Sequence, residues 1–133
     1  DAAHNPQGAR ALAAALKDSF TFVRLVGVLA VLKDKEATEI LEALDPVLDE
    51  VVISQTTSPR AMSARQLGEL AVGVFGEHRV TVVRDLPDAL DRAAELADEG
   101  GVAGGVVATG SVITAAEVRM LLGTESTEDL PQG

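Results

Sequence analysis

The chain has 133 residues, with 21 acidic and 11 basic side chains, a formal net charge of -10 and no cysteine. This excess of negative charge argues against nucleic acid or an anionic membrane as a partner, because both attract proteins through basic patches. The lack of cysteine excludes a disulfide framework and a thiolate nucleophile, and two histidines are too few for an all-imidazole zinc site, so we expect no metal site in this chain. No apolar run reaches membrane length and no signal peptide is visible, so we expect a cytoplasmic protein.

Size and composition predict one domain with an aliphatic core. Hydrophobic residues make up 47% of the chain, but only three are Phe and there is no Trp or Tyr. At this length, a core of Ala, Val, Leu and Ile buries enough surface to fold alone. Residues 124–133 are polar, acidic and aperiodic, which predicts a flexible acidic tail. The domain is therefore expected over residues 1–123.

The first six residues place an acid and an imidazole directly before a helix. Asn5 has the chemistry of an N-cap, Pro6 suits the first helical position, and apolar residues at helical spacing continue to about Ser19. The amides and the positive dipole of a helix start attract anions, above all phosphate. Asp1 and His4 are therefore candidates for phosphate or ribose binding, with capping and solvation of the helix as the alternative. Because a strand precedes such a turn and none precedes Asp1, we expect a domain cut from a longer protein and lacking its first strand.

The rest of the chain alternates strands with helices. Val-rich apolar runs predict buried strands, and apolar residues at helical spacing behind Pro or capping-box residues predict helices. In chain order, the expected elements are a strand over 20–29, a helix over 34–44, a strand over 50–54, a helix from Ser63 to Gly76, a strand over 79–84, a helix from Pro87 to Ala97, a strand over 105–109 and a helix from Thr114 to about Gly123. This order predicts a three-layer α/β fold, in which a mainly parallel, open sheet carries helices on both faces.

Four polar clusters fall on the predicted strand-to-helix connections. They are residues 1–5, 33–36, 55–60 and 109–111. Such connections all lie at one edge of a parallel sheet, where α/β proteins bind ligands, so we expect the clusters to face one crevice. The helix-to-strand joint at residues 76–79 falls on the opposite edge, and His78 is expected to be exposed without a chemical role. Arg24, inside an otherwise apolar strand, is expected to mark the edge of that strand or to pair with a neighbouring acid.

Each cluster also has a structural interpretation. Lys33 and Lys35 can be solvent-facing charges, with Asp34 as the helix cap. Arg60 can be a salt-bridge partner within its loop, although its guanidinium fork also suits a carboxylate. Residues 109–111 can form a sharp turn whose hydroxyls and amides hold an anion, or an ordinary turn.

The chain lacks the motifs of a self-sufficient nucleotide enzyme. It contains no GxxxxGK[ST] phosphate loop and no GxGxxG fingerprint after a strand. No Ser–His–Asp order stands out either. A stand-alone enzyme is therefore not expected.

Four segments follow one another in an order and spacing that match a known family. They are DAAHNP at 1–6, GVLAVLKDKE at 27–36, SPRA at 58–61 and ATGSVITAAEVR at 108–119. Together they resemble the C-terminal domain of the bacterial folylpolyglutamate synthase and dihydrofolate synthase family, within the Mur ligase superfamily. The resemblance extends to about Gly123 and implies a Rossmann-like domain. It also implies an ATP-dependent ligase that joins L-glutamate to dihydropteroate or to the γ-carboxylate of a folate through an acyl phosphate.

The resemblance further implies contacts with the nucleotide. Asp1 would meet the ATP ribose, and His4 and Asn5 would lie beside the phosphates. The phosphate loop and Mg²⁺ belong to the family's central ATPase domain, which this chain lacks. The isolated domain would therefore be inactive.

The same resemblance implies contacts with the amino-acid substrate. Lys35 and Ser111 would hold the carboxylates of the incoming glutamate, and Arg60 would contact an anion. Thr109 and Gly110 would form the supporting turn. Closure of this domain over the central domain would bring these groups to ATP and to a pterin or folate substrate.

Two further interpretations remain open on the sequence alone. The chain can be a non-catalytic nucleotide-binding or protein-interaction module with the same sheet, or the C-terminal domain of a peptidoglycan Mur ligase. A phosphate-loop domain upstream of Asp1 would favour a ligase, and a muramyl-nucleotide-binding domain further upstream would favour the peptidoglycan branch.

Overall fold

In the computed structural model, the described residues are 5–19, 24–33, 36–99, 104–108 and 111–114. Their five strands are β1 Leu25–Leu29, β2 Glu50–Ile53, β3 Val80–Val82, β4 Gly105–Ala108 and β5 Ser111–Thr114. Their four α-helices are α1 Pro6–Ser19, α2 Ala37–Leu44, α3 Ala64–Phe75 and α4 Leu86–Asp98. No helix in these ranges is long and apolar enough to cross a lipid bilayer.

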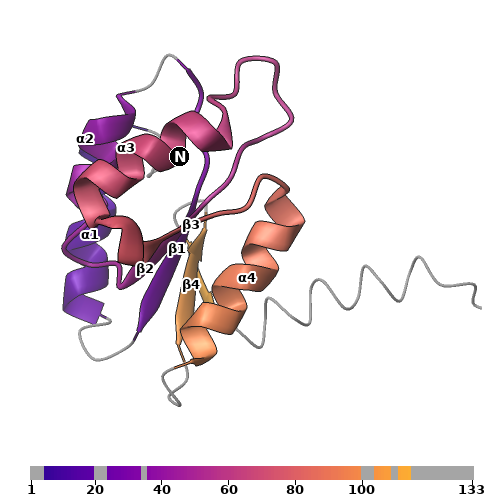
Figure 1. Cartoon of the computed structure of the whole chain (residues 1–133). Coiled ribbons are helices and arrows are strands. Elements are labelled where there is room, and N and C mark those ends of the chain that lie inside the picture. The colour runs from indigo at the N-terminus through magenta and orange to yellow at the C-terminus, as the bar shows by residue number, and fades with distance from the viewer. Residues whose placement is uncertain (1–4, 20–23, 34–35, 100–103, 109–110, 115–133) are drawn as a thin grey trace, which may run out of the picture.

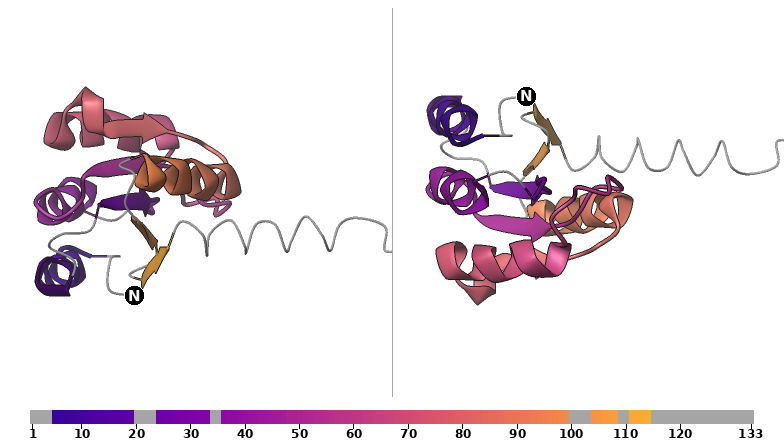
Figure 2. Two further views of the ribbon diagram at one scale, coloured as in Figure 1. Left: turned by 90° about the horizontal axis from the view of Figure 1, so that it is seen from below. Right: turned by 90° about the horizontal axis from the view of Figure 1, so that it is seen from above.

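The strands form a single sheet in the order β3-β2-β1-β4-β5. The pairs β1–β2, β1–β4 and β2–β3 are parallel, and only β4–β5 is antiparallel. Helices α1, α2 and α3 lie on one face of the sheet and α4 lies on the other, as the end-on views show most clearly (Figures 1 and 2). The predicted α/β fold with a mainly parallel sheet and helices on both faces is confirmed.

Strand β1 lies at the centre of the sheet and is buried along its whole length. Leu25 and Leu29 belong to the core beneath α1, α2 and α3, whereas Val26 and Val28 belong to the core beneath α4. Successive side chains of a strand point to opposite faces, so an apolar run without polar positions suits a strand covered on both sides. Because β2 and β4 both run parallel to β1, all three strands end at the same edge of the sheet.

Side-chain caps fix the starts of three helices. Asn5 Oδ1 accepts a hydrogen bond from the Gly8 amide at 2.7 Å, and Ser63 Oγ accepts one from the Gln66 amide at 3.1 Å. These caps confirm the predicted starts of α1 and α3, because each satisfies an amide that has no partner within its helix. Asp85 caps α4 in the same way, so the helix begins at Leu86, one residue before the predicted Pro87.

The predicted start of α2 is wrong. The helix begins at Ala37, and its N-cap is Glu36 without a side-chain cap bond, rather than Asp34. Between β1 and α2, Leu32 instead forms a β-bridge with Ala61 in the loop after β2. This pairing keeps the chain extended and delays the first turn of the helix. Residues 34–35 lie outside the described residues.

Two strand boundaries also differ from the prediction. Residues Glu77–Arg79 form a 3-10 turn, so β3 begins only at Val80. The Arg79 guanidinium donates to the carbonyl oxygens of Asp45 and Leu48 and pairs with the Asp45 carboxylate at 2.7 Å, so Arg79 ties this turn to the end of α2. The strand expected over 20–29 is described only from Leu25, with residues 20–23 outside the described residues.

The last predicted unit needs the largest correction. Residues Ser111–Thr114 form β5, which pairs antiparallel with β4 in the register Val106↔Ile113 and Val107↔Val112. The connection predicted to run from this strand into a helix therefore joins two strands instead, and its residues 109–110 lie outside the described residues. The β-branched side chains of this segment favour a strand. Residues 115–133, which include the predicted helix beyond Thr114 and the predicted tail, lie outside the described residues.

Gly104 and Gly73 provide a matched test of the core between α4 and β4. A Cβ at Gly104 would lie 2.3 Å from the Ala97 carbonyl oxygen, whereas a Cβ at Gly73 in α3 would meet nothing within 4 Å. We expect Gly104→Ala to lower the free energy of unfolding by about 1–3 kcal/mol through overpacking against rigid backbone. Gly73→Ala should raise it by about 0.5–1 kcal/mol through helix propensity. Urea denaturation measures both, and a neutral Gly104→Ala would contradict this packing.

Candidate functional site

The connections that follow β1 and β2 are joined by backbone hydrogen bonds at the carboxyl edge of the sheet. Leu32 and Ala61 form an antiparallel bridge. On either side of it, the Met62 amide donates to Val31 O and the Lys33 amide donates to Arg60 O, both at 2.9 Å. Two of the four predicted polar clusters, residues 33–36 and 55–60, therefore adjoin at this edge.

The loop that carries Arg60 is held by its own side chains. Ser58 Oγ accepts a hydrogen bond from the Arg60 amide at 3.1 Å, and the Ser58 carbonyl accepts one from the Ala61 amide at 3.0 Å. Gln55 Oε1 accepts from the Ala64 amide at 2.9 Å, which ties the beginning of the loop to the beginning of α3. These contacts fix the Arg60 backbone while its side chain remains exposed.

Ser54 links the same edge to β1 and to the start of α4. It is the one fully buried polar side chain of the described core. Its amide donates to Leu29 O at 2.8 Å, and its hydroxyl donates to Arg84 O at 2.9 Å. A buried hydroxyl needs such a partner, because an unsatisfied one costs free energy. In the sequence, Ser54 is recognisable only as the serine that directly follows the apolar residues of β2.

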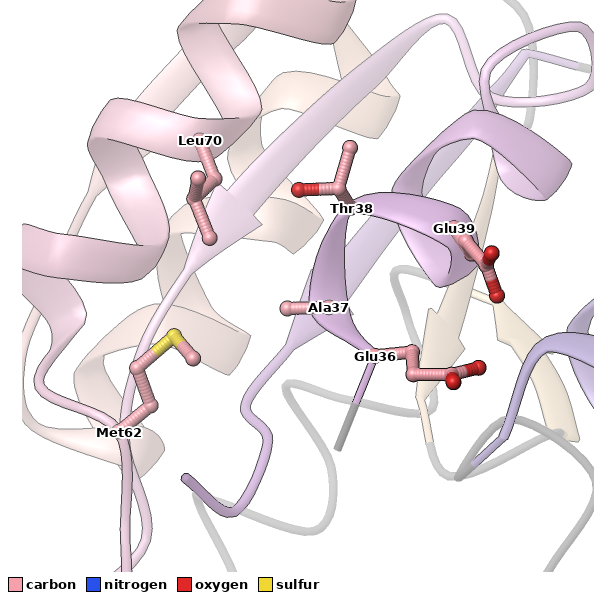
Figure 3. A pocket seen from close by; sticks show the side chains of 6 residues that line it. All are labelled: Glu36, Ala37, Thr38, Glu39, Met62 and Leu70. Carbon is pink, nitrogen blue, oxygen red and sulfur yellow. The ribbon is translucent and has the colours of Figure 1, made fainter. Parts of the chain in front are cut away.

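A shallow hollow of about 350 Å³ lies between the start of α2 and α3 (Figure 3). Ala37 and Thr38 point toward Met62 and Leu70 across it, while Glu36 and Glu39 point toward the other side of α2. The Met62 amide also donates the hydrogen bond to Val31 O, so the hollow borders the joined connections.

Glu36 is the N-cap residue of α2 and belongs to the connection that follows β1. Its pKa is raised above the ordinary value of 4.5, first by its side-chain hydrogen bond with Glu39, then by the negative charge of Glu39 and by slight desolvation. The positive charge of Arg10 on α1 opposes this rise. Hydrogen bonding to the protonated form and a neighbouring like charge both favour the neutral carboxyl.

The predicted site residues are described only in part. Asn5 is exposed and caps α1 with its side chain. Arg60 lies in the loop after β2, and Ser111 opens β5 beside the end of β4, with Ala108 as its partner in the register. Since β4 ends at the same edge as β1 and β2, Ser111 and Arg60 both belong to connections at that edge. The remaining five lie outside the described residues: Asp1, His4, Lys35, Thr109 and Gly110.

The opposite edge of the sheet carries structural ion pairs. Arg24 pairs with Glu50 and donates Nε to the Leu96 carbonyl at 2.8 Å, which confirms the predicted acid partner. Arg24 directly precedes β1, which begins at Leu25. The Arg79 guanidinium also lies 4.8 Å from the centre of the Phe75 ring, and His78 is exposed as expected.

The sheet, with helices on both faces and polar connections at the carboxyl ends of its parallel strands, defines an α/β domain of the kind that binds ligands at that edge. Residues 1–112 match the family described as "Mur ligase, glutamate ligase domain", and the chain belongs to this family. It is 47% identical over 135 residues to the dihydrofolate synthase/folylpolyglutamate synthase of Mycobacterium tuberculosis, across 94% of this chain and 28% of that protein.

Solved structures agree with this assignment. The folylpolyglutamate synthase of M. tuberculosis complexed with ADP and AMPPCP is 48% identical, with a TM-score of 0.77, over 92% of this chain and 29% of that one. A bifunctional folylpolyglutamate synthase/dihydrofolate synthase with Mn, AMPPNP and L-glutamate bound is 30% identical, with a TM-score of 0.68, over 92% of this chain and 28% of that one. The chain thus spans less than a third of the length of these relatives.

The raised pKa of Glu36 predicts a pH-dependent stability difference. A carboxyl whose pKa is higher in the folded state adds stability that is complete below the unfolded value of 4.5 and is lost as the pH rises through the folded value. The negative charge of Glu39 disfavours the ionised form of Glu36, so we expect Glu36→Gln to melt at a higher temperature than the unmodified chain at pH 7. Below pH 4.5 the difference should disappear.

Thermal melts from pH 3.5 to pH 8 measure this difference. Glu42→Gln is the control, because it removes the same charge from an exposed position of α2. If Glu36→Gln and Glu42→Gln shift the melting temperature equally at every pH, the Glu36–Glu39 contact has no energetic effect.

Proposed function

We propose that this chain is the C-terminal, glutamate-binding domain of an ATP-dependent ligase. The ligase adds L-glutamate to dihydropteroate, to folylpolyglutamate or to both, through an acyl phosphate. The family match and a relative with 47% identity across 94% of this chain support the proposal. The related structure with Mn, AMPPNP and L-glutamate bound supports the same substrates.

The observation that carries the proposal is the pairing of two connections at the carboxyl edge of the sheet. The bonds from Lys33 N to Arg60 O and from Met62 N to Val31 O hold cationic residues from separate parts of the chain beside one another. Transfer of a phosphoryl group to a carboxylate, followed by attack of an amine, gathers negative charge in one place. Fixed cations and amides stabilise such charge without reorganising, even in a chain of net charge -10.

The proposed roles follow the connections of the sheet. Asp1, His4 and Asn5 contact ATP at the start of α1. Lys35 and Arg60, from the connections after β1 and β2, bind carboxylates of glutamate. Ser111, after the turn of residues 109–110, provides a hydroxyl to the same substrate.

The divalent cation, Mg²⁺ in our proposal, and the phosphate loop belong to a part of the ligase outside this chain. The described residues contain no group of three His, Asp or Glu side chains that fits a metal ion. We therefore place this domain as the partner that closes over ATP and excludes water from the acyl phosphate. We further propose that the ligase works in the cytoplasm, where its substrates occur.

Steady-state kinetics of the complete ligase tests the proposal. With ATP, L-glutamate and either dihydropteroate or tetrahydrofolate, phosphate release should require all three substrates. Lys35→Ala and Ser111→Ala should each raise the KM for glutamate about tenfold, the effect of one hydrogen bond to a charged group, and should change the KM for ATP little. Arg92→Ala, at an exposed position of α4, is the control. Unchanged glutamate kinetics in both variants would contradict the proposed roles.

A further inference from the structure

One side chain joins the two ends of the loop between β2 and α3 (Figure 1). Gln55 Oε1 accepts a hydrogen bond at 2.9 Å from the amide of Ala64, the first residue of α3. The two residues are nine positions apart in the chain; Gln55 is half-buried and Ala64 is buried. Because a backbone amide only donates, the bond requires the oxygen of the Gln55 carboxamide. Gln55 therefore closes the loop.

Helix α3 has a second cap that does not close the loop. Its N-cap residue is Ser63, whose Oγ accepts a hydrogen bond from the Gln66 amide at 3.1 Å. The first amides of a helix have no partner within it, so Gln55 and Ser63 each satisfy a donor of the same turn. The Ser63 bond, however, spans only three positions of the chain. The two residues share a capping role, and the closure of the loop belongs to Gln55.

Arg60 lies inside the loop that Gln55 closes. The Ser58 amide donates to Thr56 Oγ1 at 3.3 Å, and Ser58 Oγ accepts from the Arg60 amide at 3.1 Å. The Arg60 carbonyl accepts from the Lys33 amide at 2.9 Å, which joins the loop to the chain that follows β1. A loop that is bonded at so many points has little backbone freedom, so a displacement of its first residue also displaces Arg60.

We propose that Gln55 is a positioning residue of the glutamate site: its carboxamide oxygen closes the loop and thereby places Arg60 for a carboxylate of the substrate. This inference rests on the proposed function, in which Arg60 binds glutamate. In this role Gln55 contacts the loop and not the substrate. A binding residue that is held in place before the ligand arrives loses less entropy on binding. The effect of Gln55 therefore falls on the affinity for glutamate.

Kinetics of the complete ligase tests this role. Gln55→Met keeps an unbranched side chain but lacks the carboxamide oxygen, so the Ala64 amide loses its partner. The KM for L-glutamate should rise about three- to tenfold, as for the loss of one hydrogen bond, with kcat and the KM for ATP within about twofold of the unmodified enzyme. An unchanged KM for glutamate would overturn the inference.

Gln55→Glu tests whether the oxygen is the group that matters. A glutamate retains an acceptor for the Ala64 amide, and its negative charge is favourable at the start of a helix. It should therefore return the KM for glutamate to within about twofold of the unmodified enzyme. If Gln55→Glu is as impaired as Gln55→Met, loop closure through the oxygen is wrong.

Ser63→Ala is the matched control, because it removes the other cap of α3 and leaves the loop closed. Both Ser63→Ala and Gln55→Met should lower the melting temperature, since each leaves an amide of the first helical turn without a partner. Only Gln55→Met should raise the KM for glutamate. Equal rises in both variants would overturn the inference, because fraying of α3 would then explain them.

The double variant Gln55→Met/Arg60→Ala tests whether Gln55 acts through Arg60. If it does, the KM for glutamate of the double variant should lie within about twofold of that of Arg60→Ala alone, because the position of the loop has no further effect once the guanidinium is absent. Two effects that multiply would show that Gln55 acts independently of Arg60 and would contradict the proposal.

The outcomes separate this inference from the proposed function. If the unmodified ligase consumes ATP with glutamate and an acceptor while Gln55→Met leaves every KM unchanged, the inference is overturned and the proposed function stands. If the unmodified ligase shows no glutamate-dependent ATP consumption, the proposed function fails, and the inference fails with it.

Discussion

The arrangement of the domain depends on the parallel pairing of β1 with a neighbour on each side. Val26, Gly27 and Val28 pair with β2 on one side and with β4 on the other. A strand that is bonded at both edges and buried on both faces leaves no freedom in register, because a shift by one residue would exchange its two apolar faces. All three strands consequently end together, and the chain after each must emerge at one edge of the sheet.

The charged residues at the amino edge and at the carboxyl edge of the sheet differ in their contacts. At the amino edge, Arg24 and Arg79 are engaged by carboxylates and main-chain carbonyls, so their charges stabilise the fold. At the carboxyl edge, main-chain bonds and short polar side chains such as Ser54 and Ser58 hold the backbone, and the basic residues Lys33 and Arg60 are exposed. Such an edge has a fixed backbone beneath adaptable cations, which suits the recognition of negatively charged substrates. The similarity to folate-glutamate ligases is consistent with this division.

Local patterns predicted much of the fold but little of the detail at the edge. The apolar run of β1, the caps at Asn5 and Ser63 and the stop at Gly76 follow from short-range chemistry that a sequence displays directly. The hairpin of β4 and β5 was missed because a glycine turn followed by a capping-box pattern also fits a strand-to-helix junction. The Leu32↔Ala61 bridge was missed because pairing between residues far apart in the chain leaves no local pattern. The juxtaposition of Lys33 with Arg60 therefore emerges only from the structure.

The most direct test is a crystal structure of the complete ligase with an ATP analogue and L-glutamate. Our account predicts that the glutamate carboxylates lie at the carboxyl edge of this sheet, within hydrogen-bonding distance of the connections that follow β1 and β2. Glutamate bound at the amino edge beside Arg79, or over the outer surface of α4, would contradict it.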